Sequence, residues 1–165
     1  MEIWQPAYIG IGSNLADPRE QVLRGMDRIA SIGKLSLVLR STLYGSRPLG
    51  PSDQPDFVNA AVGVLTQLAP AELLRELRAI ERAAGRAEAR KRWGPRILDL
   101  DLLVHDRTRS AGPELVLPHP GIVERNFVLY PLAEIAPDLE VPGLGRVADL
   151  KARVSAEAIW TVASS

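Results

Sequence analysis

Two carboxylates two residues apart are the side chains of this chain best placed to do chemistry. Asp99 and Asp101 lie in an otherwise apolar run from Ile97 to Val104. If this run is a β-strand, alternate side chains face opposite sides, so both aspartates share one face. Acidic side chains on an apolar strand are unfavourable unless a cation meets them, and Mg²⁺ is commonly shared between carboxylates and substrate phosphates. The spacing therefore predicts a divalent-metal site. The alternative, two acids facing solvent at a sheet edge, fits poorly with the apolar neighbours.

The segment before this strand concentrates positive charge in a protein whose formal net charge is zero. The basic residues of this segment are Arg82, Arg86, Arg90, Lys91, Arg92 and Arg96. Guanidinium groups match the oxygens of a polyphosphate, although arginine runs also form simple solvated faces. Trp93 favours a ligand, because a tryptophan within a basic loop is better explained by covering a flat molecule than by packing. Loop and strand together predict Mg-nucleotide chemistry, without a P-loop because Gly-Lys-Ser/Thr does not occur.

Two histidines complete the set of candidate side chains. His119 lies between two prolines that hold the backbone extended, and Arg125 follows six residues later. This pair suits contact with phosphates or ribose, the alternative being a histidine in a simple turn. His105 directly follows the aspartate strand, and we expect it to be a surface residue.

The composition limits the class of protein. With 165 residues, 46% of them hydrophobic and 24% charged, the chain fits one soluble domain spanning residues 1–165. Zero net charge argues against general attraction to nucleic acid or anionic membranes. No apolar run approaches the length of a membrane span, and the lack of cysteine excludes disulfides and thiolate metal sites. We expect a cytoplasmic monomer that binds neither nucleic acid nor a membrane.

The elements that must position these residues follow from hydrophobic periodicity and turn residues. The pattern predicts helices at 18–32, 70–84 and 126–134, a last helix within 147–162, and strands at 7–11, 34–44, 57–66, 97–104 and 114–117. Glu81 interrupts the apolar stripe of helix 70–84. We interpret Gly10 and Gly12 as allowing close backbone approach in a turn, because a dinucleotide motif would need a third glycine. The short connection at 45–56 favours antiparallel pairing. The sequence thus predicts a single-domain α+β fold with a ferredoxin-like β-α-β-β-α-β core, its mainly antiparallel sheet flanked by helices.

Several short segments match the motifs of one enzyme family. They are Tyr8–Leu15, Pro48–Pro51, Gln54–Phe57, Asn59–Val62, Ile80–Glu81, Arg92–Asp101, Pro118–His119, Arg125-x-Phe127 and Pro131–Pro137. The run Arg-Trp-Gly-Pro-Arg-x-x-Asp-x-Asp is the most specific of them. Through these segments the chain resembles the 6-hydroxymethyl-7,8-dihydropterin pyrophosphokinase family, over roughly residues 8–139.

The resemblance implies a reaction, two cofactor ions and a set of site residues. The pyrophosphoryl group of ATP would pass to the pterin hydroxymethyl group, giving AMP and the pterin diphosphate, a step of tetrahydrofolate biosynthesis. Asp99 and Asp101 would hold two Mg²⁺ ions and would be catalytic together with Arg86 and Arg96. The implied ATP contacts are Glu81, Arg92, Arg96, Leu102, Leu115, Val116, His119 and Arg125. The implied pterin contacts are Ser46, Arg47, Leu49, Phe57, Asn59, Trp93 and Phe127. ATP would bind first, and the loop at 86–95 would then close over both substrates.

Two departures from the family pattern affect the ATP contacts. Glu88 replaces a loop arginine, and Pro120 replaces a tyrosine after the histidine, so the number of loop contacts to ATP is left open. Two other functions also stay open. One is a small nucleic-acid-binding module whose basic loop contacts phosphates and whose aromatic side chains stack on bases. The other is a pterin- or nucleotide-binding regulator that has lost its activity.

Overall fold

The computed structural model describes residues 3–48, 53–85 and 97–162. In chain order its elements are β1 (Gln5–Ser13), α1 (Pro18–Ala30), β2 (Leu35–Arg40), β3 (Leu43–Ser46), β4 (Phe57–Thr66), α2 (Pro70–Ala83), β5 (Asp99–His105), β6 (Ser110–Ala111), β7 (Val116–Leu117), α3 (Asn126–Ile135), β8 (Glu140–Val141), β9 (Gly145–Arg146), α4 (Val147–Ala152) and β10 (Ile159–Val162). None of the described helices is long and apolar enough to cross a membrane.

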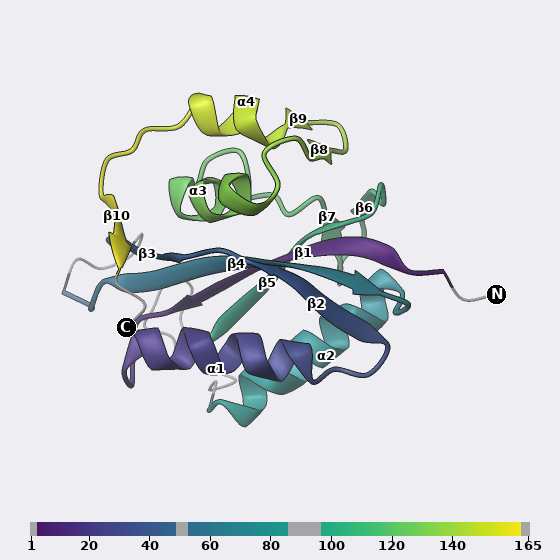
Figure 1. Cartoon of the computed structure of the whole chain (residues 1–165), viewed down its shortest axis with the longest axis horizontal. Helices are drawn as coiled ribbons and strands as arrows, with labels where there is room; N and C mark the ends of the chain where they lie inside the picture. The colour runs from purple at the N-terminus through teal and green to yellow at the C-terminus, as the bar shows by residue number, and fades with distance from the viewer. Residues whose placement is uncertain (1–2, 49–52, 86–96, 163–165) are drawn as a thin grey trace.

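One six-stranded sheet forms the centre of the molecule. Its strand order is β10-β3-β4-β1-β5, and β2 also pairs with β4. Every pair in this sheet is antiparallel. The helices α1 and α2 lie on one face of the sheet, and α3 and α4 lie on the other (Figure 1). The predicted α+β fold with a mainly antiparallel sheet flanked by helices is confirmed.

Each face of the sheet carries its own apolar cluster. The first forms because Ala7, Ile9 and Ile11 alternate along β1 and meet apolar residues spaced three or four apart on the helices. These helix residues are Val22, Met26 and Ile29 of α1 and Leu73 and Leu77 of α2. The second cluster includes Val128, Leu129 and Leu132 of α3, Val147 and Leu150 of α4, and Leu103 and Val104 of β5.

Two predicted elements are wrong in part. The single strand expected at 34–44 is divided into β2 and β3, because Ser41 binds both backbone groups of Ala61 at the break. The N–H of Ser41 donates to the carbonyl of Ala61, and Oγ of Ser41 accepts from the N–H of Ala61, each at 2.9 Å. The helix expected within 147–162 ends at Ala152, and Ile159–Val162 form the strand β10 instead. The sequence Ile-Trp-Thr-Val of β10 consists of β-branched and aromatic residues, which favour strands.

A β-bulge changes which residues of β5 face which side. The register pairs Ile9 with Leu102 but Tyr8 with Val104, which leaves Leu103 as an extra residue. After the bulge, Val104 packs in the same cluster as Leu103, and His105 turns toward the opposite face, opposite Ala7. The prediction that His105 is a surface residue is therefore wrong. It is fully buried, and its Nε2 lies 2.9 Å from the carbonyl oxygen of Leu68.

Candidate active site

A row of cross-strand neighbours joins the candidate metal ligands to the candidate ligand-binding residues. Gly12 of β1 lies opposite Asn59 of β4 on one side and opposite Asp99 of β5 on the other. Directly opposed residues of antiparallel strands place their side chains on the same face. Because neighbouring strands lie about 4.8 Å apart, the backbones at Asn59 and Asp99 are about 10 Å apart.

Glycines occupy the centre of this surface. Gly12 separates Asn59 from Asp99, and Gly10 lies opposite Asp101 in the next row. A Cβ on Gly12 would lie 3.4 Å from Oδ1 of Asn59 and 3.7 Å from the Phe57 ring. The interpretation of these glycines as turn residues is wrong, since both lie inside β1. They keep the surface between the candidate residues clear of side chains.

The environment of Asp101 is unfavourable for a free carboxylate. Its side chain is 26% exposed. Burial and the neighbouring charge of Asp99 raise its pKa to about 7, against the opposing effect of Arg78 and Arg125. No group of three or more His, Cys, Asp or Glu side chains able to hold a metal occurs within the described part of the chain. Two neighbouring carboxylates, one of them with a raised pKa, suit a divalent cation whose remaining ligands come from substrate and water.

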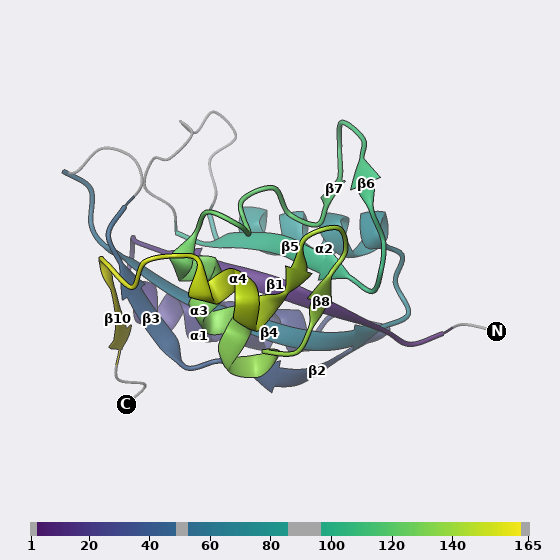
Figure 2. The ribbon, with the colours of Figure 1, turned by 90° about the horizontal axis from the view of Figure 1, so that it is seen from above.

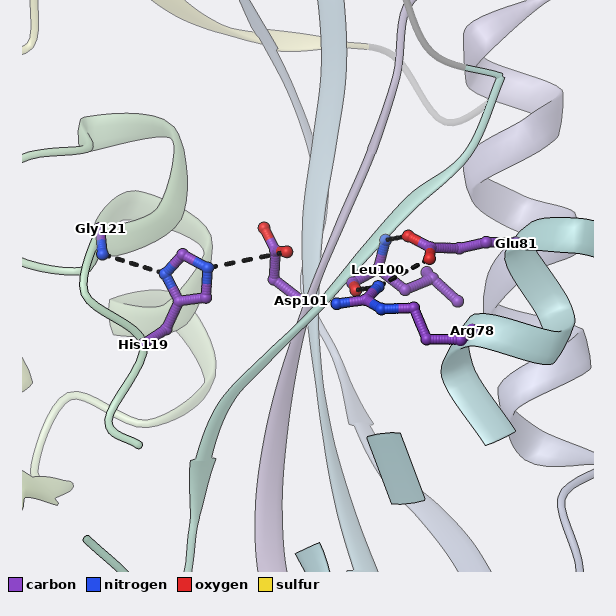
Figure 3. Close-up of polar contacts among 6 residues, drawn as sticks. All are labelled: Arg78, Glu81, Leu100, Asp101, His119 and Gly121. Carbon is purple, nitrogen blue, oxygen red and sulfur yellow. Dashed lines mark hydrogen bonds and ion pairs between the residues drawn. The ribbon is translucent and has the colours of Figure 1, made fainter. Parts of the chain in front are cut away.

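His119 faces Asp101 as a neutral imidazole. Its Nδ1 accepts a hydrogen bond from the backbone N–H of Gly121 at 3.0 Å, so the ring proton lies on Nε2. Nε2 is 3.7 Å from Oδ1 of Asp101 (Figure 3). Burial and the charge of Arg125 lower the pKa of His119 to about 4. At neutral pH, His119 can therefore donate one hydrogen bond from Nε2 without carrying a charge.

The guanidinium of Arg125 lies against the backbone of the same loop. A Cβ on Gly121 would lie 2.6 Å from this guanidinium, so the glycine makes room for it. The guanidinium carbon is also 5.9 Å from the centre of the Phe127 ring. Arg125 lowers the pKa of His119, which shows that its charge acts on the surface that His119 and Asp101 share.

Helix α2 contacts the backbone between the two aspartates from the other side of β5. Oε2 of Glu81 accepts a hydrogen bond from the N–H of Leu100 at 2.8 Å, and Nη1 of Arg78 donates to the carbonyl of Leu100 at 2.9 Å. Arg78 and Glu81 also form an ion pair of 2.6 Å (Figure 3). Because β5 is an edge strand, the two side chains satisfy backbone groups that a further strand would otherwise pair.

Because of these contacts, Glu81 is not an exposed side chain open to a ligand. Its side chain is fully buried, and its carboxylate oxygens bind Arg78 and Leu100. The expected ATP contact of Glu81 stays a prediction. Arg78 was not singled out by sequence reasoning, although a buried acid on a helix needs a partner and Arg78 is three residues before Glu81.

Several expected pterin contacts lie together at the β3–β4 end of the sheet. Asn59 is 5% exposed and Ser46 is 3% exposed. Nδ2 of Asn59 donates to Oγ of Ser46 at 2.7 Å, and the Phe57 ring is beside Gly12. Arg47 follows Ser46 with an exposed side chain. Phe127 is half-buried at the start of α3 and packs against the second cluster.

The residues expected near adenine lie beside the far edge of β5. Leu102 is 3% exposed and belongs to the first apolar cluster. Leu115 packs against that cluster, whereas Val116 of β7 is 44% exposed. A contact between adenine and Leu102 would therefore come from its backbone. The predicted roles of Leu49, Arg86, Arg92, Trp93 and Arg96 fall on residues outside those described.

Comparisons with known proteins agree with the geometry. The family model described as 7,8-dihydro-6-hydroxymethylpterin-pyrophosphokinase (HPPK) matches residues 8–137. The 2-amino-4-hydroxy-6-hydroxymethyldihydropteridine pyrophosphokinase of Pseudomonas aeruginosa is 46% identical over 155 residues, 94% of this chain and 95% of that protein. The protein of the same name from Haemophilus influenzae is 44% identical over 144 residues, 87% of this chain and 89% of its own length.

A solved structure shows the same fold at low sequence identity. The crystal structure of wild-type Plasmodium falciparum HPPK-DHPS matches with a TM-score of 0.70 and 13% identity. The match covers 93% of the present chain, which spans 45% of that longer one.

Proposed function

The chain belongs to the 7,8-dihydro-6-hydroxymethylpterin-pyrophosphokinase family and transfers pyrophosphate to hydroxymethyldihydropterin in folate biosynthesis, and from this premise we propose how its residues carry out the transfer. ATP is the donor in this proposal, and Asp99 and Asp101 are the residues that would hold two Mg²⁺ ions. The observation that supports this proposal is the row Asn59–Gly12–Asp99, which places the residue proposed to bind the pterin and a carboxylate proposed to bind metal on one face of the sheet. We also propose that the protein acts as a cytoplasmic monomer.

The aspartates fit the ions because of their environment. Asp101 is partly buried beside Asp99, and its raised pKa shows that the free site disfavours a second negative charge. When bound, the ions would supply positive charge beside the triphosphate, and the two carboxylates would hold that charge in place. The residues of the chain have the task of holding the carboxylates, phosphates and pterin in line.

Contacts to the phosphates come from groups that surround Asp101. Neutral His119 can donate from Nε2 to a phosphate oxygen, and Arg125 supplies positive charge on the same side. We propose that Arg92 and Arg96 add further contacts, with Arg86 acting during loop closure. Phosphoryl transfer depends chiefly on positioning and on stabilising charge, so this arrangement needs no strong protein base.

The pterin would stack between the Phe57 and Phe127 rings, with Trp93 closing over it. Aromatic rings favour offset stacking on flat heterocycles. Asn59 is buried and already donates to Ser46, so its carboxamide is held in one orientation for hydrogen bonding to the pterin edge. Backbone groups near Arg47 and Leu49 would complete the contacts.

AMP release from ATP tests this function. We expect AMP to form only when both hydroxymethyldihydropterin and Mg²⁺ are present, and EDTA to stop the reaction. Binding of ATP and pterin without turnover would instead support a non-catalytic regulator. A salt-dependent gel shift with RNA would support the nucleic-acid-binding alternative.

A further inference from the structure

The C-terminal segment at 155–162, which we name the C-terminal strap, contacts the sheet next to Ser46. Its strand β10 pairs with the outer edge of β3, so that Ile159 lies opposite Ser46 and Trp160 opposite Gly45. The N–H of Arg47 also donates to the carbonyl of Ala158 at 3.3 Å. Figures 1 and 2 show the strap running from α4, on one side of the sheet, to the edge of β3.

A glycine receives the strap on the sheet. A Cβ at Gly45 would overlap the indole of Trp160, so the ring lies directly on the backbone of β3. Trp160 shares its face with Val58, the face opposite to the pterin residues, because Gly45 pairs with both. The strap therefore pairs with the edge of β3 and covers one face of it with Trp160. Its Ile159 lies beside Ser46 on the other face, which carries the proposed pterin contacts.

The strap is also bound to the start of α3. Nδ2 of Asn126 donates to the carbonyl oxygens of Ser155 and Glu157, each at 2.9 Å. Asn126 lies between Arg125, the residue just before α3, and Phe127 of α3, and both neighbours belong to the proposed site. At the other end of the helix, Glu134 accepts hydrogen bonds directly from Thr42 and from the Tyr44 hydroxyl.

From these contacts we propose that Asn126 is a positioning residue that fixes the width of the pterin pocket through the C-terminal strap. The strap joins two walls that belong to different layers: β3 and β4 supply Ser46, Asn59 and Phe57, and α3 supplies Phe127. Stacking depends on ring separation, so loosening the strap weakens pterin binding and leaves the aspartate site intact. This inference rests on the proposed pterin contacts.

The substitution Asn126→Asp tests the strap, because aspartate has the same shape but no N–H to donate. We expect the KM for hydroxymethyldihydropterin to rise about three- to tenfold, because only part of the effect of losing two ordinary hydrogen bonds reaches the pterin pocket. The KM for ATP should stay within about twofold of the wild-type value, because the guanidinium of Arg125 lies against the backbone at Gly121, which is not part of the strap. The amide of Arg47 should exchange its hydrogen faster, because its partner Ala158 is part of the strap.

A matched control removes a different hydrogen bond from the same segment. Oγ of Ser155 accepts only a local bond from the N–H of Glu157 among the contacts shown, at 2.9 Å, so Ser155→Ala leaves the bond from Asn126 to the strap in place. We expect this variant to keep wild-type values of both KM and of Arg47 exchange.

The outcomes separate this inference from the proposed function. A melting temperature lowered in Asn126→Asp with unchanged pterin KM would reduce Asn126 to a purely structural residue and overturn the inference. So would equal increases in both KM values. If the wild-type protein forms no pterin-dependent AMP, the proposed function fails, and unchanged exchange at Arg47 would then overturn the strap coupling by itself.

Discussion

The two faces of the sheet are filled in different ways, and β5 shows the difference within one strand. Leu100 and Leu102 of β5, with Leu98 just before the strand, belong to the apolar cluster that packs against α1 and α2. Asp99 and Asp101 alternate with them toward the other face, where the apolar cluster takes up β5 only from Leu103 onward. At the start of the strand, one face therefore supplies apolar packing, whereas the other face carries charge there and is packed only from Leu103 onward. The comparison shows that alternate residues of one strand can carry charged groups on one face while the other face keeps its apolar packing.

The largest expected effect comes from a substitution that changes only the charged face of the sheet. Asp101→Ala should lower kcat by about a hundred- to a thousandfold or more, because a group that holds charge in the transition state is lost. The fold should survive, since the side chain is not part of either apolar cluster. Initial rates of AMP formation and a circular dichroism spectrum measure the two properties. Near-wild-type activity would remove the metal assignment.

A change on the packed face should do the reverse. Leu77→Ala removes a fully buried side chain of α2 and should lower the free energy of unfolding by about 2–5 kcal/mol. The kcat of the molecules that remain folded should change little, because Leu77 faces the opposite side of the sheet from the aspartates. Urea denaturation followed by assays in its absence would check both statements. A large fall in kcat would show that the faces are coupled more tightly than their packing indicates.

Glu81 offers a way to sharpen the comparison, because it comes from the packed side and reaches the backbone between the aspartates. Glu81→Ala leaves the buried N–H of Leu100 without its acceptor, which should lower the free energy of unfolding by about 1–3 kcal/mol. Glu81→Gln keeps an acceptor for this N–H and should lose less stability. Measuring Mg²⁺-dependent rates in both variants shows whether the bond also positions Asp99 and Asp101. Equal losses of stability would show that the carboxylate charge matters more than the bond to Leu100.

The last expected effect concerns pH. The pKa of Asp101 is raised to about 7 in the folded protein, so ionisation opposes folding: its favourable contribution is full below the unfolded pKa of about 4 and is lost as pH rises through 7. In the absence of metal, Asp101→Asn should therefore raise the melting temperature more at pH 8 than at pH 4. Thermal melts with EDTA test this difference. The same stabilisation at both pH values would mean that burial of the charge is not its cause.

Local sequence patterns predicted much of this arrangement, and the failures have identifiable causes. The aspartates could be placed on one face because alternation needs no knowledge of neighbouring strands. His105 could not be placed, since the extra residue Leu103 reverses the alternation and depends on how β5 pairs with β1. The break at Ser41 likewise depends on the partner residue Ala61. Gly10 and Gly12 carried the signal of a side-chain-free surface, but only the register with Asn59 and Asp99 explains it.

The arrangement of Asn59, Gly12 and Asp99 also determines which residues can vary without changing the distance between the two candidate side chains. The distance between the two candidate side chains equals two strand spacings across the hydrogen-bonded sheet, so it is set by the main chain. Residues that line the surface can exchange and alter how tightly each substrate is held. The distance between the two proposed substrate sites stays constant as long as β4, β1 and β5 remain paired.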